Sequence, residues 1–146
     1  MSVYESRRKE SQAQFIVAAR TFRLTTLRIC KKFPKSYQYS LTNKIVQTVQ
    51  DIYLNCVRGN TIFITENMPL KDYSMRHNYL QTALCDTEAM LAEITFCYTI
   101  LDSGNNIFAE KYDYIKAFSR WTEEGNELQR LLKNLIQSDK KKYNKE

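Results

Sequence analysis

The residues of this chain that could do chemistry are cations gathered in its first quarter. Residues 1–36 hold nine Lys or Arg against two acidic residues, a net charge of +7. Ammonium and guanidinium groups bind phosphates without a fixed motif, and a nearby phenol ring can stack on an unpaired base. We therefore expect nucleic-acid contacts from the first helix and its following loop, at Arg20, Arg23, Arg28, Lys31, Lys32 and Lys35.

Other interpretations of this charge stay open. Residues 37–104 hold four basic residues against seven acidic ones, a net charge of −3. The basic front of one copy could therefore dock on the acidic middle of another, or both could be solvated surfaces. The neighbouring Tyr37 and Tyr39 could stack on bases or simply cap the core where the chain turns.

Catalysis finds little support in this sequence. His77 is the only histidine, so no cluster with more than one imidazole can form. The acidic residues Asp86, Glu88 and Glu93 do not form the Glu-x-x-His pattern of di-iron bundles, and no phosphate-binding Gly-rich loop occurs. We expect a protein that is not an enzyme and holds neither a metal nor a cofactor.

The four cysteines are predicted to be buried free thiols. No two of them form a CxxC pair, and each lies in an apolar helical stripe. A free cysteine behaves as a small hydrophobic residue in a core. The four residues are Cys30, Cys56, Cys85 and Cys97.

Length and composition predict one all-helical domain. The chain has 146 residues, three Gly and two Pro, and it lacks alternating runs of Val, Ile and Thr. It also lacks the run of about 18 apolar residues that a membrane helix needs, and its N-terminus has no apolar leader. We expect a cytoplasmic protein without a membrane partner. Residues 1–137 would form the domain, and residues 138–146 a flexible basic C-terminal tail.

Hydrophobic periodicity predicts four helices, over residues 11–32, 40–64, 71–101 and 108–136. Pro34 ends the first, because proline lacks an N–H donor and restricts the residue before it. The short breaks favour antiparallel neighbours, so the expected fold is an up-down-up-down antiparallel four-helix bundle. The inward residues of the third helix would be Tyr73, His77, Leu80, Leu84, Thr87, Leu91, Ile94, Tyr98 and Leu101. Those of the fourth would be Phe108, Tyr112, Ile115, Phe118, Trp121, Leu128, Leu132 and Leu135.

The first helix carries more apolar surface than one buried face requires. Ile16, Leu24 and Leu27 lie off its inward stripe and alternate with arginines. Aliphatic groups set among guanidinium groups are typical of a subunit interface with a charged rim. We expect these three residues to form an oligomer interface, although singly exposed leucines are also normal on soluble proteins.

Four segments carry a resemblance to a known family. They are FPKSYQYSLTNKI (33–45), DIYLNCVRGN (51–60), NYLQTALCDTEAMLAEITFCYTI (78–100) and FAEKYDYIKAFSRWTEEGNELQRLLKNL (108–135). The first resembles a Phe-Pro-Lys loop before a second helix, and the others resemble the helices that come after it. The family unites the accessory variability determinant (Avd) proteins of diversity-generating retroelements with proteins encoded in 23S rRNA intervening sequences.

The resemblance implies a homo-pentameric ring of four-helix bundles. In the Avd branch the ring binds the template RNA and the reverse transcriptase and supports mutagenic cDNA synthesis. The intervening-sequence branch implies a homo-oligomeric structural or protein-interaction bundle with no defined nucleic-acid partner. Both branches stay open on the sequence, and neither supplies a catalytic residue.

Overall fold

The computed structural model describes residues 3–102 and 113–144, with side chains placed for residues 14–101 and 113–144. Four long helices account for most of these residues. They are α1 (Val3–Cys30), α2 (Asn43–Asn60), α3 (Leu70–Asp102) and α4 (Tyr114–Tyr143). No strand occurs in these ranges. The predicted all-helical class with four helices is confirmed.

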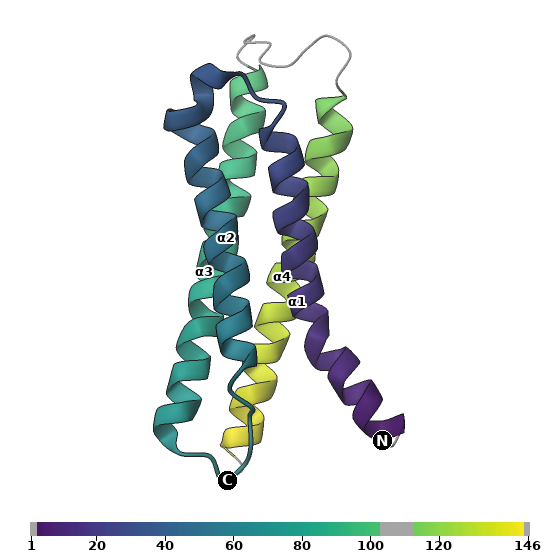
Figure 1. Ribbon diagram of the computed structural model, residues 1–146, viewed down its shortest axis with the longest axis vertical. Helices are drawn as coiled ribbons and strands as arrows, with labels where there is room; N and C mark the ends of the chain where they lie inside the picture. The colour runs from purple at the N-terminus through teal and green to yellow at the C-terminus, as the bar shows by residue number, and fades with distance from the viewer. Residues whose placement is uncertain (1–2, 103–112, 145–146) are drawn as a thin grey trace.

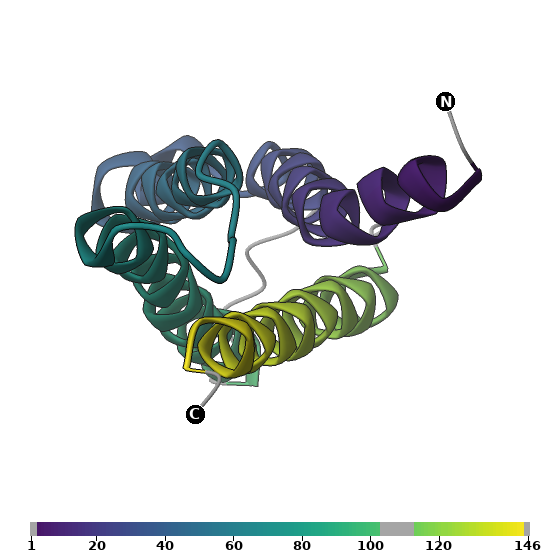
Figure 2. The ribbon, with the colours of Figure 1, turned by 90° about the horizontal axis from the view of Figure 1, so that it is seen from below.

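The helices surround a single core. α1 packs against α2 and α4, and α3 packs against the same two neighbours. Figure 2 shows this arrangement along the length of the molecule. In Figure 1 the link from α1 to α2 lies at the upper end, and the link from α2 to α3 lies at the lower end. The last turns of α1 consequently lie beside the first turns of α4, where Thr25 and Ile29 share a pocket with Asp113 and Ala117.

The break between α1 and α2 contains Pro34. α1 ends at Cys30, and Pro34 adopts φ −62° and ψ 151°, an extended conformation that interrupts the helix. A 3₁₀ turn, Lys35–Tyr37, and a π-helical segment, Gln38–Thr42, then lead into α2. The chain is thus already helical in character at Ser40, where the sequence predicted the second helix, although regular α-helix begins at Asn43.

Large aromatic side chains from α1 and α4 fill the middle of the core. Phe22, Phe118 and Trp121 have no exposed surface. The Trp121 indole N–H donates to the Thr26 hydroxyl at 2.8 Å, and this hydroxyl donates to the Phe22 carbonyl at 2.7 Å. Both polar side-chain groups are therefore paired, which offsets the cost of removing them from water.

Gly125 allows α4 to approach its neighbours closely. A Cβ atom at this buried position would come within 2.7 Å of Leu91 Cδ2 and 3.2 Å of the Phe22 ring. These distances are shorter than ordinary carbon contacts. The glycine inside a helix is explained by this approach of α1 and α3, at the usual cost in helix propensity.

A buried ion pair links the start of α3 to the end of α4 and contacts the end of α2. These helix ends lie at the lower end of the bundle in Figure 1. Arg76 of α3 and Asp139 of α4 are only 4% and 5% exposed. Arg76 donates to both carboxylate oxygens, at 2.6 and 3.2 Å, and its Nη1 also donates to the carbonyls of Gly59 and Ile62, at 3.3 and 2.8 Å. We call these four residues the Arg76 clamp. It adds side-chain donors to the carbonyl of Gly59, in the last turn of α2, and to that of Ile62, just beyond the helix.

α4 differs from its prediction in where it ends and in the exposure of one residue predicted to face inward. It continues to Tyr143, so residues 138–143 belong to the helix and the expected tail after residue 137 does not begin there. The Tyr143 ring stacks on Tyr73 of α3 with 4.1 Å between centroids. Ile115, predicted to face inward, is exposed, because it lies about 100° from the centre of the buried face. Phe108 and Tyr112 lie outside the described residues.

Candidate nucleic-acid interface

The predicted cations of α1 and its following loop lie mostly on the surface. Burial of Ala19, Phe22 and Ile29 fixes the inward face of α1, so residues on the opposite arc must face water. The exposed members of the predicted set are Arg20, Arg28, Lys31, Lys32 and Lys35. The sequence thus identified five accessible cations, and all of them except Arg20 lie at one end of the bundle.

Arg23 has a different environment from the other five. It is half-buried on the side of α1 that faces α2, and its guanidinium carbon lies 5.5 Å from the centroid of the Tyr53 ring. A guanidinium over a ring face gains a cation–π attraction. Arg23 therefore contributes to the packing of α1 on α2, besides the charge that it adds to this surface.

The two tyrosines of the loop have separate roles. Tyr37 is half-buried and contacts the Phe33 ring edge-on, with 6.3 Å between centroids. It therefore caps the core. Tyr39 is 81% exposed and lies within the same short loop as Lys35. Of the two, Tyr39 is the ring that is available to stack on a base.

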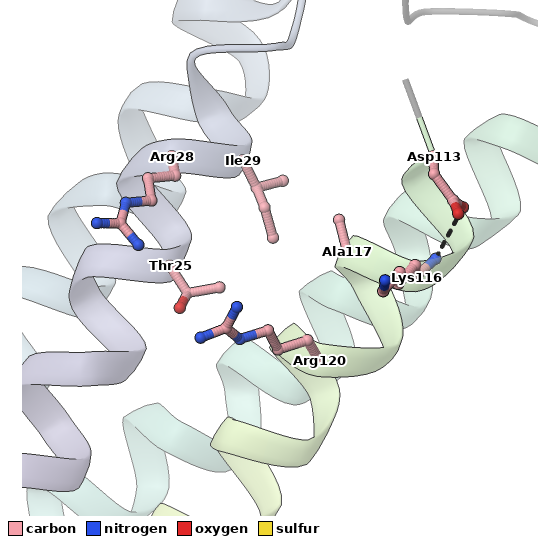
Figure 3. A pocket seen from close by; sticks show the side chains of 7 residues that line it. All are labelled: Thr25, Arg28, Ile29, Asp113, Lys116, Ala117 and Arg120. Atoms are coloured by element: carbon pink, nitrogen blue, oxygen red, sulfur yellow. Dashed lines mark hydrogen bonds between the residues drawn. The ribbon is translucent and has the colours of Figure 1, made fainter. Parts of the chain in front are cut away.

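A pocket of about 280 Å³ opens between α1 and α4 beside these cations (Figure 3). Its lining combines apolar and cationic side chains, with three residues from each helix and the N-cap residue of α4. The lining residues are Thr25, Arg28, Ile29, Asp113, Lys116, Ala117 and Arg120. Sequence reasoning found Arg28 and missed Lys116 and Arg120, because their proximity depends on which helices are neighbours.

The side chains of the pocket point in distinct directions in Figure 3. Ile29 and Ala117 approach each other across the gap, and the Arg120 guanidinium extends toward Thr25. Arg28 lies along the outer side of α1. Among the described lining residues the only carboxylate is Asp113, whose Oδ1 accepts the Lys116 backbone N–H at 3.1 Å as the N-cap of α4. Three cations against one carboxylate make this pocket suitable for an anion.

A second hollow, of about 240 Å³, lies further along the same two helices and is acidic. It is lined by Ala18, Thr21, Glu123, Glu124 and Glu127. Glu124 joins the two hollows, because its Oε1 accepts from Arg120 Nε at 3.3 Å. The space between α1 and α4 therefore changes from cationic to anionic along its length.

The predicted interface residues of α1 divide into two kinds. Ile16 packs partly against the core, and Leu27 is half-buried. Leu24 is 46% exposed, and Val17, which the sequence reasoning passed over, is 52% exposed. Val17 and Leu24 are seven residues apart and share one face of α1. Arg20 lies between them in the sequence and is also exposed.

The predicted burial of the thiols is correct for Cys56 and Cys97, holds in part for Cys30 and is wrong for Cys85. Cys56 and Cys97 are buried and Cys30 is half-buried, and burial raises the pKa of each of these thiols to about 12. Cys85 is exposed on the outer side of α3, because Ala83, Leu84 and Thr87 turn the opposite face inward. All four are free thiols.

Groups of metal-ligating residues and membrane-spanning helices are absent from the described part of the chain. Among residues 14–101 and 113–144, no three His, Cys, Asp or Glu side chains are grouped in a way that could hold a metal ion. In the same ranges no helix combines the length and apolar character needed to cross a bilayer.

Comparison with known proteins gives no family assignment, since no family model, curated protein or solved structure matches the chain. The resemblance to the Avd family therefore stays a prediction.

Proposed function

We propose that this chain is a non-catalytic, cytoplasmic RNA-binding accessory protein of a diversity-generating retroelement. In this role it binds the template RNA and the reverse transcriptase and supports mutagenic cDNA synthesis. The observation that carries the RNA-binding part is the cationic end of the bundle. We define this end as the exposed Arg28, Lys31, Lys32 and Lys35, together with Lys116 and Arg120 across the pocket.

The cationic end suits a polyanion for electrostatic reasons. Exposed ammonium and guanidinium groups displace counterions condensed on phosphates, so binding gains free energy from counterion release. Asp113 is the one carboxylate among the described residues of the pocket, and it is already engaged at the N-terminus of α4. The exposed Tyr39 adds a ring on which an unpaired base can stack, as in proteins that bind single-stranded RNA.

The proposed assembly is a homo-pentameric ring of up-down-up-down antiparallel bundles. The antiparallel course is supported by the contacts of the last turns of α1 with the first turns of α4. The ring is supported by the resemblance and by the exposed Val17 and Leu24 on α1. Burial of these side chains against a second copy would remove apolar surface from water.

Charge reversal in the loop after α1 tests RNA binding. The variant Lys31→Glu, Lys32→Glu, Lys35→Glu changes three exposed residues outside the long helices, so helical content should stay constant. We expect the wild-type protein to retard template RNA in a gel at about 50 mM salt and the variant to lose this binding. Lys133→Glu, Lys140→Glu, Lys141→Glu is the matched control, because these exposed lysines lie in the C-terminal half of α4.

The control has the same net charge as the loop variant, so it separates a local site from overall attraction. It should keep most of the affinity of the wild-type protein. Equal losses in both variants would show that only the net charge matters, and a wild-type protein that fails to retard the RNA would refute the proposed function.

A second candidate function is that of a homo-oligomeric structural bundle, of the 23S rRNA intervening-sequence type, without a nucleic-acid partner. The exposed Val17 and Leu24 beside Arg20 favour it. Salt separates the two functions, because binding to phosphates weakens steeply as salt rises, whereas a mainly apolar interface does not. An oligomer that is stable at high salt and never binds RNA would support the second function.

A further inference from the structure

The pocket between α1 and α4 contains an arginine whose orientation is set by a largely buried carboxylate. Arg120 is 70% exposed in its side chain, whereas Glu124, one turn later on α4, is 15% exposed. Arg120 Nε donates to Glu124 Oε1 at 3.3 Å. The buried partner is the less mobile of the two, so it restricts the rotamers that the exposed arginine can adopt.

This contact determines which donors of Arg120 remain for a ligand. Because Nε faces Glu124, the terminal Nη groups extend toward Thr25 and into the gap, as Figure 3 shows. Guanidinium groups bind phosphate oxygens through such paired N–H donors. An arginine held in this orientation loses less conformational entropy when a phosphate binds.

The rest of the lining has the polarity of a nucleotide backbone. Lys116 places a further cation in the lining, Arg28 adds positive charge from the outer side of α1, and Ile29 and Ala117 provide apolar surface inside. A backbone phosphate carries one negative charge and is flanked by ribose, which presents carbon atoms. A volume of about 280 Å³ exceeds that of a few water molecules, at about 30 Å³ each, so it admits a phosphate with part of a sugar.

We propose that this pocket binds one backbone phosphate of RNA through Arg120 and Lys116, with Arg28 at its rim, and that Glu124 is the positioning residue for Arg120. The proposal rests on the proposed RNA-binding function and adds a defined site to it. It also assigns a role to residues of α4 that the charge pattern of residues 1–36 did not include.

Removal of the Glu124 carboxylate offers a test, because a positioning role and simple electrostatics predict opposite changes in RNA affinity. Removal of a carboxylate near a phosphate site should strengthen RNA binding if only charge matters. If Glu124 orients Arg120, its removal should weaken binding. The adjacent Glu123 is exposed and lines the acidic hollow, while Arg120 Nε bonds to Glu124. Glu123→Ala therefore has the same charge change without the loss of orientation.

The experiment uses fluorescence anisotropy with a labelled single-stranded oligouridylate and the full-length protein. Arg120→Gln should weaken binding about tenfold, the size expected for a charge-assisted hydrogen bond. It should also reduce the salt slope by about one unit. Lys133→Gln, on the exposed side of α4, is the matched control and should change the affinity much less.

The carboxylate variants complete the test. Compared with the wild-type protein, Glu124→Ala should weaken RNA binding and Glu123→Ala should strengthen it. Glu124→Gln should not weaken it, because the amide oxygen can still accept from Arg120 Nε. Circular dichroism and thermal melts of each variant identify any loss of folding. If Glu124→Ala melts early, the comparison of Arg120→Gln with Lys133→Gln still decides whether the pocket binds RNA, since neither variant empties the buried position.

Each result separates this proposal from the broader function. If the wild-type protein binds the oligouridylate but Glu124→Ala strengthens binding as Glu123→Ala does, or Arg120→Gln behaves like Lys133→Gln, the pocket proposal is refuted and RNA binding stands. If the wild-type protein does not bind RNA, both fail. Acetylation of Lys116 followed by mass spectrometry, with inorganic pyrophosphate as the added anion, detects a third outcome. Protection by pyrophosphate without RNA binding would refute the RNA assignment and identify a small-anion site.

Discussion

Asp139→Asn should destabilise the protein strongly, although Asp139 lies in a stretch whose sequence resembles a solvated basic tail. The change keeps the size of the side chain and removes its charge. It leaves Arg76 buried at 4% exposure, with only the carbonyls of Gly59 and Ile62 as full partners. A buried cation that loses its counter-ion cannot regain water without opening the structure.

The size of the effect follows from the geometry of the Arg76 clamp. Arg76 donates to both oxygens of Asp139, at 2.6 and 3.2 Å, so the pair is bidentate as well as buried. Removal of one partner from such a pair costs about 3 to 5 kcal/mol. Against a total stability of about 5 to 15 kcal/mol this is a large fraction. For a domain of this size it corresponds to a fall in Tm of roughly 6 to 20 °C.

Urea unfolding followed by circular dichroism measures this free energy directly. Arg130→Gln serves as the control, because it breaks an exposed pair between Arg130 and Glu127 within one helix and should leave the midpoint almost unchanged. The double variant Arg76→Met with Asp139→Leu should lose less stability than Asp139→Asn, because it leaves no buried charge. A chain shortened to end at Gln137 should be destabilised at least as much as Asp139→Asn. An Asp139→Asn variant as stable as the wild-type protein would refute the reasoning, because Asp139 would then be part of a solvated tail.

Three further predictions concern the core, the thiols and the assembly. Thr26→Val should lower the free energy of unfolding by about 1 to 3 kcal/mol, because it leaves the buried Trp121 indole N–H without an acceptor. Thr26→Ser keeps the hydroxyl and should lower it less. Urea unfolding would measure both variants, and equal losses would contradict the role of the hydroxyl. In the folded protein the Cys56 thiol has a pKa of about 12, whereas the ordinary thiol value is 9.0. The unfolded chain therefore releases this proton first as pH rises. For this thiol the free energy of unfolding should fall above pH 9.0, by up to about 1.4 kcal/mol per pH unit. Cys56→Ala should reduce this slope between pH 9 and pH 12, leaving the contributions of Cys30 and Cys97. The exposed Cys85→Ala should not change it, and the same slope in Cys56→Ala as in the wild-type protein would contradict the assignment. Leu24→Glu should reduce the mass measured by light scattering toward the 17.3 kDa protomer without loss of helical content, and a wild-type protein that is already monomeric would contradict the predicted interface.

Local chemistry allowed the number of helices and their breaks to be predicted. Pro34 stops a helix by removing a donor, whatever surrounds it. The spacing of Leu80, Leu84 and Ile94 requires one face of α3 to be buried, and these residues are buried. Such features depend on residues close together in the chain, so one sequence is enough to infer them.

The Arg76 clamp could not be predicted in the same way, because its charged partners are 63 positions apart. A signal was nevertheless present. Asp139 continues the apolar stripe of Leu132 and Leu135, and Arg76 lies between Tyr73 and Leu80 at similar spacing. One charge of each sign on two inward stripes indicates a buried pair. The run of lysines after Asp139 favoured a solvated tail instead, and it concealed this pattern.

The candidate site likewise contains residues that the sequence identified and residues that only helix packing brings together. The exposure of Arg28 follows from the apolar stripe of α1, and the lysines after α1 lie in the break around Pro34, so the sequence was sufficient to select them. The approach of Lys116 and Arg120 to Arg28 depends on α4 lying beside α1 and on the rotation of each helix. The stacking of Arg23 on Tyr53 likewise requires knowledge of which side of α1 faces α2.

The salt dependence of binding to template RNA tests the central proposal most directly. Fluorescence anisotropy of labelled RNA with the wild-type oligomer, in a salt series from about 50 mM upward, yields the number of phosphates contacted. For a single-stranded RNA, about five contacts per protomer would give a slope of log K against log salt of about −3.5. We predict a slope of that order for the wild-type protein and a much shallower one after reversal of Lys31, Lys32 and Lys35. No binding at about 50 mM salt, or a slope near zero, would contradict the proposal that this bundle binds RNA.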